Sequence, residues 1–270
     1  MKPVLSVPDS PSVCIERKGP VTTLVINRPH VRNAIDSRAA RELSEAFLDF
    51  ENDPESRVAV VCGRGGHFCA GGDLAAMVAE GCNPIRQKGD GPLGISRLSL
   101  SKPVIAAISG YAVAGGLELA LFCDIRIAEE SAVLGFFNRR WGLPLCNGST
   151  VRLPRIIGHG RAMEMILTGR PVYSEEALSY GLVTRVVANG TVREEAEDLA
   201  AEMAGFPFEG LMCDRRNALS HFTMPIDEAL DHELMNAAEV FDNDDALKGA
   251  RAFVAGNGRH GAFGGKLGAS

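Results

Sequence analysis

Short runs of β-branched and other apolar residues recur along the first half of the chain, each bounded by glycine, proline or polar residues. Runs of this length and composition predict strands, most of them buried. The expected strands are Val13–Ile15, Val21–Ile26, Val58–Cys62, Pro103–Ile108 and Ile125–Ala128. Between them, residues 37–52 carry apolar side chains at three- and four-residue intervals, which predicts a helix with Ser37 as its N-cap.

Two glycine-bearing turns, residues 63–72 and 110–116, each stand between an expected strand and an expected helix. The order strand, glycine turn, helix therefore occurs twice, at Val58–Met77 and at Val104–Cys123, with a short apolar helix expected over Leu117–Phe122. This repetition favours an α/β fold of stacked ββα units over a simple doubly wound sheet.

Helical periodicity replaces the strand pattern in the last part of the chain, most clearly at residues 194–203, 226–241 and 246–255. Residues 81–92 have no period and are rich in glycine, proline and charge, so we expect a mobile loop there. The resulting division of the chain is a core over residues 12–200, a helical region over 201–256 and a glycine-rich tail over 257–270.

Composition narrows the function classes. The chain has 270 residues, a formal net charge of −6 and no long basic stripe, so nucleic acid is not expected as a partner. No run of about 18 apolar residues predicts a membrane-spanning helix, and no apolar run of signal-peptide length occurs near the start. The seven cysteines are odd in number and include no Cys-x-x-Cys, which is typical of a reducing, cytoplasmic environment.

The paired glycine turns are the first candidates for chemistry. Backbone N–H groups where a strand ends and a helix begins have no helical partner, and a residue without a side chain lets a ligand oxygen approach them. Two such groups that converge on one point form an oxyanion hole. The simpler interpretation is a pair of tight corners without function. A dinucleotide site is disfavoured because neither turn has the pattern Gly-x-Gly-x-x-Gly.

Several ordered motifs resemble those of the crotonase (enoyl-CoA hydratase/isomerase) superfamily over roughly residues 12–255. Arg28-Pro29-x-x-x-Asn33-Ala34 is similar to its opening signature, and Phe68-Cys69-Ala70-Gly71-Gly72-Asp73-Leu74 to its oxyanion motif. The stretch from Lys102 to Leu119, with Gly110, Gly115 and Gly116, is similar to the segment that carries the second donor. The likeness continues through Arg152–Arg155, Thr168–Arg170 and Ala177–Val183.

This resemblance implies a fold and a binding site. The fold would be a crotonase-like spiral of repeated ββα units with a C-terminal helical oligomerisation region, assembled as a homotrimer or a dimer of trimers. Gly72 and Gly115 would donate their N–H groups to a thioester oxygen. The acyl-CoA would be the only small-molecule partner, with no separate cofactor and no metal. The implied substrate-binding residues are Val31, Ala70, Asp73, Leu74, Phe137 and Arg139.

Hydratases of this family use two glutamates, and only one is present here. Glu118 stands three residues after Gly115 in an apolar segment, where an acid is costly unless it has a role or a partner. It is the predicted catalytic acid, although an acid there also complements a helix N-terminus. The second position is Asn138, an amide that orients water but does not exchange a proton at neutral pH.

Two arginines beside Asn138 are a further departure from the family pattern. Arg139 and Arg140 stand where hydratases usually have aliphatic residues. Either one is an ordinary surface residue, or it points inward and pairs with Glu118 or with a carboxylate on the acyl group.

Other catalytic classes fit less well. His67 and Cys69 are too few for a metal site, and no Gly-x-Ser-x-Gly elbow indicates a hydrolase triad. The sequence therefore predicts an enoyl-CoA hydratase that uses Glu118 assisted by Asn138. Two alternatives remain open because the second acid is missing. One is another enolate chemistry on acyl-CoA, such as double-bond isomerisation, decarboxylation or hydrolysis. The other is acyl-CoA binding without catalysis.

Overall fold

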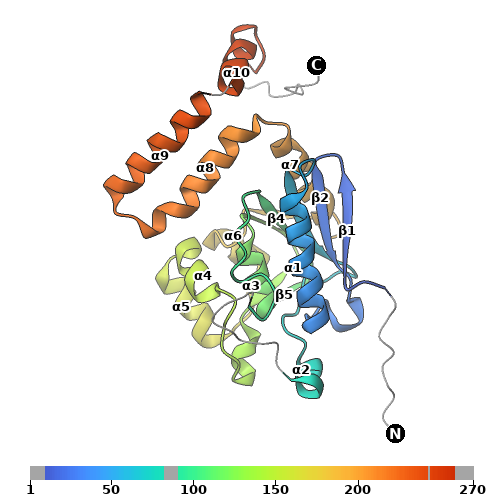
Figure 1. The fold of residues 1–270 in the computed structure, drawn as a ribbon. Helices are drawn as coiled ribbons and strands as arrows, with labels where there is room; N and C mark the ends of the chain where they lie inside the picture. The colour runs from blue at the N-terminus through green and yellow to red at the C-terminus, as the bar shows by residue number, and fades with distance from the viewer. Residues whose placement is uncertain (1–9, 82–90, 243, 259–270) are drawn as a thin grey trace.

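A computed structural model describes residues 10–81, 91–242 and 244–258. Within those residues a larger sheet of six strands runs through the body of the molecule, and a smaller sheet of three strands lies beside it (Figure 1). The larger sheet has the order β1 (Val13–Lys18), β2 (Val21–Ile26), β3 (Val58–Gly63), β4 (Val104–Ile108), β6 (Ile125–Glu129), β9 (Arg185–Val187). The smaller sheet has the order β5 (Tyr111–Val113), β7 (Val133–Gly135), β8 (Val172–Tyr173).

The helices connect these strands or follow them. In the described chain they are α1 (Ser37–Asn52), α2 (Leu74–Glu80), α3 (Gly115–Phe122), α4 (Ser149–Ile157), α5 (His159–Thr168), α6 (Ser174–Tyr180), α7 (Val192–Ala204), α8 (Phe208–Ser220), α9 (Ile226–Phe241) and α10 (Asp244–Val254). Short 3₁₀ helices span Pro29–Val31, Phe137–Trp141 and His221–Thr223. The predicted α/β fold of ββα units is confirmed. Two strands followed by a helix occur as β4, β5, α3 and again as β6, β7, α4.

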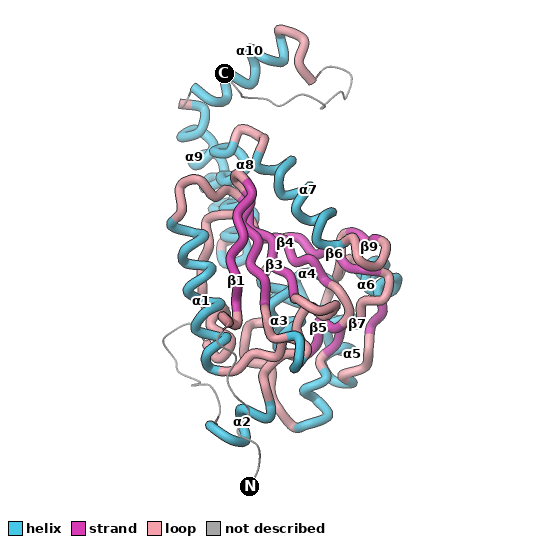
Figure 2. Tube along the Cα trace, turned by 90° about the vertical axis from the view of Figure 1, so that its right-hand side faces the viewer, coloured by secondary structure: helices cyan, strands magenta, loops and turns pink. Residues whose placement is uncertain are grey.

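Alternating residues of the larger sheet face two different layers. Strand β3 shows the pattern: Ala59 and Val61 lie in the main core with α1 and α3, whereas Val58 and Val60 lie in a second core under α7. Helix α7 contributes a stripe of small apolar residues at four-residue spacing, from Val192 to Ala204. Figure 2 shows α1 and α7 on opposite sides of the sheet. Since both faces are covered, the inner strands β3 and β4 are apolar throughout.

Two expected helix starts are corrected by the structure. The N-cap of α1 is Asp36 and not Ser37, because the Asp36 carboxylate accepts the Ala39 N–H at 2.8 Å. Helix α3 begins at Gly115 and not at Leu117, so the second glycine turn leads directly into the helix. The loop expected at residues 81–92 falls mostly outside the described residues.

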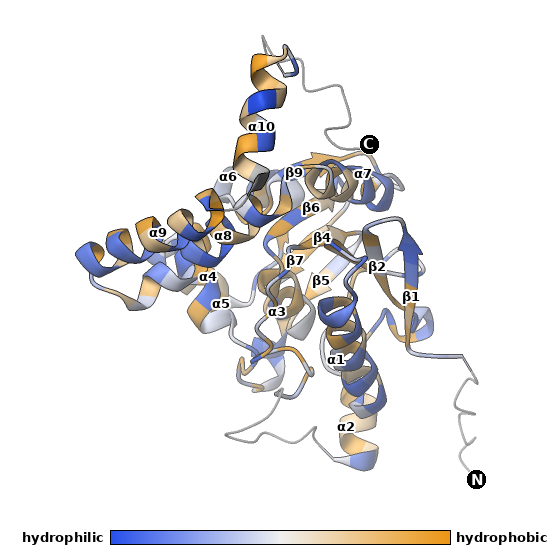
Figure 3. Cartoon of the chain, turned by 45° about the horizontal axis from the view of Figure 1, so that its top comes forward, coloured by the Kyte–Doolittle hydropathy of each residue, from blue (hydrophilic) through white to orange (hydrophobic). Residues whose placement is uncertain are grey.

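Helices α8 to α10 extend away from the body of the molecule (Figure 1). Helix α8 is attached to the body through Arg215, which donates to Asp124 Oδ2 at 3.0 Å and to the Leu100 carbonyl at 2.7 Å. Helix α9 has no buried residue among those described, although Ile226, Leu234 and other large apolar side chains lie along it. Figure 3 shows these hydrophobic stretches alternating with polar ones. Every helix in the described ranges is too short or too polar to cross a membrane.

Candidate active site

The first glycine turn follows β3 and is held against the segment before α1. The Ile35 N–H donates to the Gly71 carbonyl at 2.7 Å, and the Asp73 N–H donates to the Ile35 carbonyl at 2.9 Å. These two bonds pair residue 35 with Gly72 in a parallel bridge. On the other side, Cys69 pairs with Ala112 of β5. The turn is therefore anchored to two separate parts of the chain.

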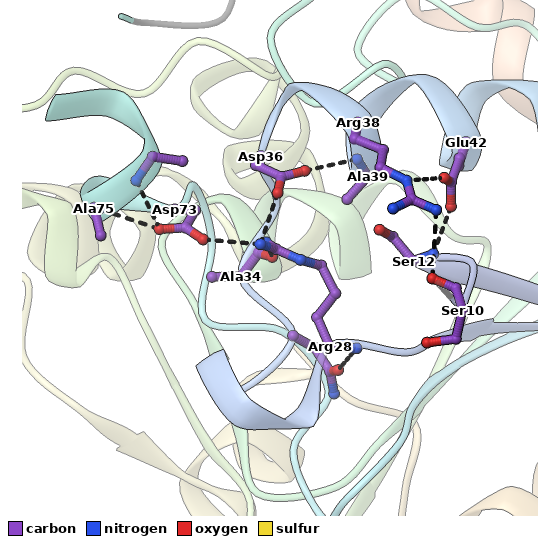
Figure 4. A network of polar contacts seen from close by, with 12 residues as sticks. Ser10, Ser12, Arg28, Ala34, Asp36, Arg38, Ala39, Glu42, Asp73 and Ala75 are labelled. Atoms are coloured by element: carbon purple, nitrogen blue, oxygen red, sulfur yellow. Dashed lines mark hydrogen bonds and ion pairs between the residues drawn. The ribbon is translucent and has the colours of Figure 1, made fainter. Parts of the chain in front are cut away.

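An arginine locks the end of this turn. The Arg28 guanidinium contacts Asp36 Oδ2 at 2.6 Å and Asp73 Oδ2 at 3.1 Å, and it also donates to the Ala34 carbonyl (Figure 4). Each of the two carboxylates also caps a helix, Asp36 at α1 and Asp73 at α2, where it accepts the N–H groups of residues 75 and 76. One guanidinium thus fixes the starts of both helices around the turn. The polar role of Asp73 is structural, although Asp73 also lines the cavity described below.

The second glycine turn has an unusual backbone conformation. Ala114 has φ +51° and ψ −123°, a region that residues with a side chain rarely adopt and that costs on the order of 1–3 kcal/mol. Its N–H donates to the Gly135 carbonyl at 2.8 Å, which ties the turn to β7. The conformation turns the chain sharply from β5 into α3, so that Gly115 becomes the first residue of the helix.

The two turns meet at close range. A methyl group on Gly71 would lie 2.8 Å from the Gly115 nitrogen, and one on Gly115 would lie 3.5 Å from the Gly72 nitrogen. Neither the Gly72 N–H nor the Gly115 N–H donates to any acceptor in the described part of the chain. Both glycines line one cavity of about 340 Å³. The arrangement provides two neighbouring backbone donors for a ligand oxygen.

Glu118 lies on the first turn of α3 and also lines this cavity. Its side chain is buried, with the residue 2% exposed, in a helix that is apolar on all sides. Its Oε1 accepts the Asn147 backbone N–H at 2.9 Å and the Ser149 hydroxyl at 2.8 Å, and its Oε2 accepts the Asn147 side-chain Nδ2 at 3.0 Å. Three strong donors therefore satisfy a carboxyl group that would otherwise be costly to bury.

Asn138 lies in the 3₁₀ helix after β7 and lines the same cavity. Its Nδ2 donates to the Leu143 carbonyl at 2.7 Å, so the orientation of the amide is defined. Its Oδ1 is buried and has no hydrogen-bond partner among the described residues. A buried acceptor without a partner costs free energy unless a bound molecule supplies a donor.

Eight of the ten predicted site residues line this one cavity. They are Ala70, Gly72, Asp73, Leu74, Gly115, Glu118, Phe137 and Asn138. Val31 and Arg139 do not line it, and their part in substrate binding stays a prediction. The Arg139 Nε donates to the Ile166 carbonyl at 3.3 Å, and Arg140 stacks 4.4 Å from the centre of the Phe137 ring. Both arginines are exposed, and neither forms an ion pair with Glu118 within the described ranges. The alternative that one of them binds a carboxylate on the acyl group stays a prediction.

Sequence reasoning missed the residues that hold Glu118. Asn147 and Ser149 are not among the predicted site residues, and both are buried against Glu118. A buried glutamate requires donors, but nothing in the local pattern indicates which distant segment supplies them. Cys146 and Trp141 also line the cavity and were not predicted to do so. Partial burial, followed by the charge of Glu118, raises the pKa of the Cys146 thiol.

The His67 and Cys69 side chains near the first turn contribute to packing. Burial raises the pKa of the Cys69 thiol to about 12, so this thiol stays protonated and inert. The His67 Nδ1 accepts the Tyr111 N–H at 3.4 Å, and burial, followed by the nearby Arg32 charge, lowers the pKa of His67. The parts of the chain that the structure describes contain no group of three or more His, Cys, Asp or Glu residues arranged to hold a metal ion.

Comparison with known proteins agrees with this geometry. The family model described as "Enoyl-CoA hydratase/isomerase" matches residues 16–260. The chain belongs to the enoyl-CoA hydratase/isomerase family. Within this family it is 36% identical over 256 residues to the enoyl-CoA hydratase EchA19 of Mycobacterium tuberculosis, a match that covers 92% of this chain and 96% of the relative. It is also 36% identical to the carnitinyl-CoA dehydratase of Salmonella typhi, over 91% of this chain and 96% of that one.

Solved structures of the family show the same fold. The crystal structure of an enoyl-CoA hydratase from Mycobacterium tuberculosis H37Rv superposes with a TM-score of 0.86 at 33% identity, and it covers 91% of this chain and 96% of that chain. The crystal structure of a probable enoyl-CoA hydratase/isomerase from Mycobacterium abscessus gives a TM-score of 0.83 at 33% identity, with coverage of 91% and 96%. The predicted family and fold are therefore confirmed.

Proposed function

We propose that this member of the enoyl-CoA hydratase/isomerase family is an enoyl-CoA hydratase, which adds water to the double bond of a 2-enoyl-CoA thioester. One observation carries the proposal: a buried carboxyl group, Glu118, lines the same cavity as Gly72 and Gly115, whose N–H groups have no acceptor among the described residues. Relatives named as an enoyl-CoA hydratase and a carnitinyl-CoA dehydratase, whose names describe adding or removing water, support it.

The two glycine donors serve the thioester oxygen. When water attacks the β-carbon, negative charge moves through the α-carbon to this oxygen, which becomes an enolate. Backbone N–H groups of Gly72 and Gly115 stabilise that charge without reorganisation, and one such donor is typically worth about 2.7–4 kcal/mol. The reaction then needs one proton removed from water and one delivered to the α-carbon.

Glu118 is the group that moves the proton. A carboxylate oxygen accepts about two hydrogen bonds in its plane, and both positions on Oε1 are filled by Asn147 and Ser149. Among the described residues Oε2 accepts a hydrogen bond only from the Asn147 amide, so it keeps an acceptor position for water. In the proposed step Oε2 takes a proton from water as the water oxygen bonds to the β-carbon. The same proton then passes to the α-carbon, which regenerates the carboxylate.

Asn138 replaces the second acid by orienting the water. Water has two O–H bonds, and Glu118 uses one of them. The free Oδ1 of Asn138 accepts the other, which leaves a lone pair of the water oxygen to face the β-carbon. The fixed bond from Asn138 Nδ2 to Leu143 prevents the amide from presenting a donor instead. This role requires no proton exchange at Asn138.

The test is hydration of a panel of 2-enoyl-CoA substrates, beginning with crotonyl-CoA, in which the loss of enoyl thioester absorbance measures the rate. Glu118→Gln is expected to lower kcat by about 10²–10⁴-fold, the usual contribution of a positioned acid or base. Glu129→Gln is the matched control, because Glu129 is also buried, accepts the Gly190 N–H at 2.9 Å and does not line the cavity. No turnover of any chain length by the wild-type protein would reject the proposal.

The amide at Asn138 also motivates the second candidate, a different enolate chemistry on acyl-CoA. Double-bond isomerisation, decarboxylation or thioester hydrolysis needs the oxyanion hole but not a second acid. Mass analysis of the products from an acyl-CoA panel separates these reactions from hydration. Hydration adds the mass of water to the acyl-CoA, decarboxylation removes that of carbon dioxide, thioester hydrolysis releases free CoA, and isomerisation leaves the mass unchanged. If the protein only binds acyl-CoA, calorimetry detects binding and Glu118→Gln alters no activity in the panel.

Assembly as a homotrimer or a dimer of trimers is part of the same proposal. Helix α9 exposes large apolar side chains, among them Ile226 at 71% and Met235 at 72% exposure. Patches of this kind are uncommon on monomers and favour a covered interface. Light scattering coupled to gel filtration measures the molar mass, and a monomer at micromolar concentration would contradict the proposal.

A further inference from the structure

Asn147 holds Glu118 through two different groups. Its backbone N–H donates to Oε1 at 2.9 Å, and its side-chain Nδ2 donates to Oε2 at 3.0 Å. Together these bonds reach both oxygens and fix the rotation of the carboxylate as well as its position. The backbone bond is available to any residue at position 147, whereas the bond to Oε2 depends on the amide. Oε2 is also the oxygen that keeps an acceptor position for water.

The orientation of the Asn147 amide is determined by its other contacts. Its Oδ1 accepts the Leu93 backbone N–H at 3.2 Å and the Ser96 hydroxyl at 2.7 Å. A backbone N–H only donates, so the oxygen must face Leu93 and the nitrogen must face Glu118. Asn147 is 3% exposed, and every polar atom of its amide has a partner. Such a fully satisfied buried network is rigid.

The same contacts connect Glu118 to the cavity wall beside the oxyanion hole. Leu93 lines the cavity, and its Cδ1 would lie 2.8 Å from a methyl group on Gly115. Arg152 closes the network from behind, because its Nη1 donates to the Asn147 carbonyl at 2.9 Å and its Nη2 to the Ser96 carbonyl at 3.2 Å. The carboxylate, the loop at 93–96 and the second glycine turn are thus joined through one amide.

We propose that Asn147 is a positioning residue, which holds the Glu118 carboxylate and the Leu93–Ser96 loop in a fixed relation to Gly115. The proposal rests on the proposed role of Glu118 in moving a proton. Proton transfer and attack on the β-carbon both require near-contact geometry, and a displacement of about 1 Å costs up to about a hundredfold in rate. Asn147 acts through Glu118: its two bonds fix the rotation of the carboxylate and therefore the position of Oε2.

Three substitutions test this role. Asn147→Ala removes the bond to Oε2 and is expected to lower kcat for enoyl-CoA hydration about ten- to a hundredfold with little change in KM. Ser96→Ala keeps the amide but removes one donor to its oxygen, so a smaller fall in kcat is expected. Asn147→Asp places a second carboxylate against Glu118. Two carboxylates at one site retain a shared proton to higher pH, so the acid limb of the kcat profile is expected to move to higher pH.

Thr22→Val is the matched control for loss of a buried polar group. The Thr22 hydroxyl is fully buried and bonds Ser56 at 2.7 Å, away from the cavity lining. This variant is expected to lower the melting temperature while kcat and its pH profile stay unchanged. A wild-type kcat in Asn147→Ala, or an acid limb that does not move in Asn147→Asp, would overturn the proposal. If Asn147→Ala does not fold, Ser96→Ala decides, and its wild-type kcat would count against the role.

A crystal structure of the Asn147→Ala variant separates this inference from the proposed function. The expected result is a Glu118 side chain that has left the position seen beside Ser149. An unchanged Glu118 rotamer would overturn the positioning role even if hydration is confirmed. Conversely, a wild-type protein that hydrates no substrate rejects the hydratase proposal, while a displaced Glu118 in the variant still supports positioning.

Discussion

Gly71 combines a left-handed backbone conformation with close contacts to the second glycine turn, so its replacement tests how the two turns meet. Gly71 has φ +94°, and a methyl group there would lie 2.8 Å from the Gly115 nitrogen and 2.9 Å from the Ala114 Cβ. The backbone conformation alone costs an alanine on the order of 1–3 kcal/mol. The contacts are with backbone and a short side chain, so they are relieved only if the turns move apart.

Separation of the turns moves the Gly72 and Gly115 donors away from a common oxygen. Loss of one oxyanion donor typically costs about 2.7–4 kcal/mol, or 10²–10³ in kcat. Gly71→Ala is therefore expected to lower kcat for crotonyl-CoA hydration by about that factor. The strain also lowers the melting temperature, by about 2–4 °C for each kcal/mol in a domain of this size. Steady-state kinetics and thermal unfolding measure the two effects independently.

Gly190→Ala separates backbone strain from disruption of the site. Gly190 has φ +87°, but a methyl group there would meet no atom within 4 Å, and it does not line the cavity. This control is expected to lose stability to a similar backbone cost and to keep its kcat. The reasoning is refuted if Gly71→Ala turns over within about twofold of the wild type, or if Gly190→Ala loses as much kcat.

Three further predictions concern side chains. In Asn138→Asp the new carboxyl group faces the Leu143 carbonyl, to which it donates a hydrogen bond only when protonated. The melting temperature of this variant relative to wild type should therefore fall as pH rises from 5 to 8, and a difference that stays constant with pH would contradict the prediction. Iodoacetamide should alkylate Cys146, which lines the cavity, and block hydration. The thiolate is the reactive form and partial burial raises the pKa of this thiol, so the alkylation rate should increase as pH rises. Acyl-CoA should slow the labelling, and labelling that acyl-CoA does not slow would place the thiol outside the site. Hydrogen bonds from Arg170 hold the pKa of Glu176 at about 2, below its usual 4.5, so the stabilisation is present above pH 4.5 and lost toward pH 2. Arg170→Met should therefore lower the melting temperature at pH 7, and the difference from wild type should shrink between pH 4.5 and 2.

Periodicity and motif predicted the elements that depend on local sequence. The strands β2, β3 and β4 and the helix α1 appear close to their expected bounds, because continuous apolar runs and three-to-four spacing are strong local signals. Errors occurred at helix starts, where the cap is decided by which nearby side chain reaches the free N–H groups. Asp36 caps α1 with one carboxylate oxygen while the other contacts Arg28, and spacing alone does not reveal this second contact.

The sequence by itself determined that two glycine turns and one glutamate, Glu118, belong to a common site, because each belongs to a contiguous motif with its own spacing. Only the tertiary structure decided which residues complete that site. Asn147 reaches Glu118 from 29 residues away along the chain. The Asn138 oxygen, which has no partner in the described parts of the chain, is oriented by the bond from its amide nitrogen to the Leu143 carbonyl. Contacts of this kind depend on how separate segments cross in space, and a one-dimensional pattern carries no record of those crossings.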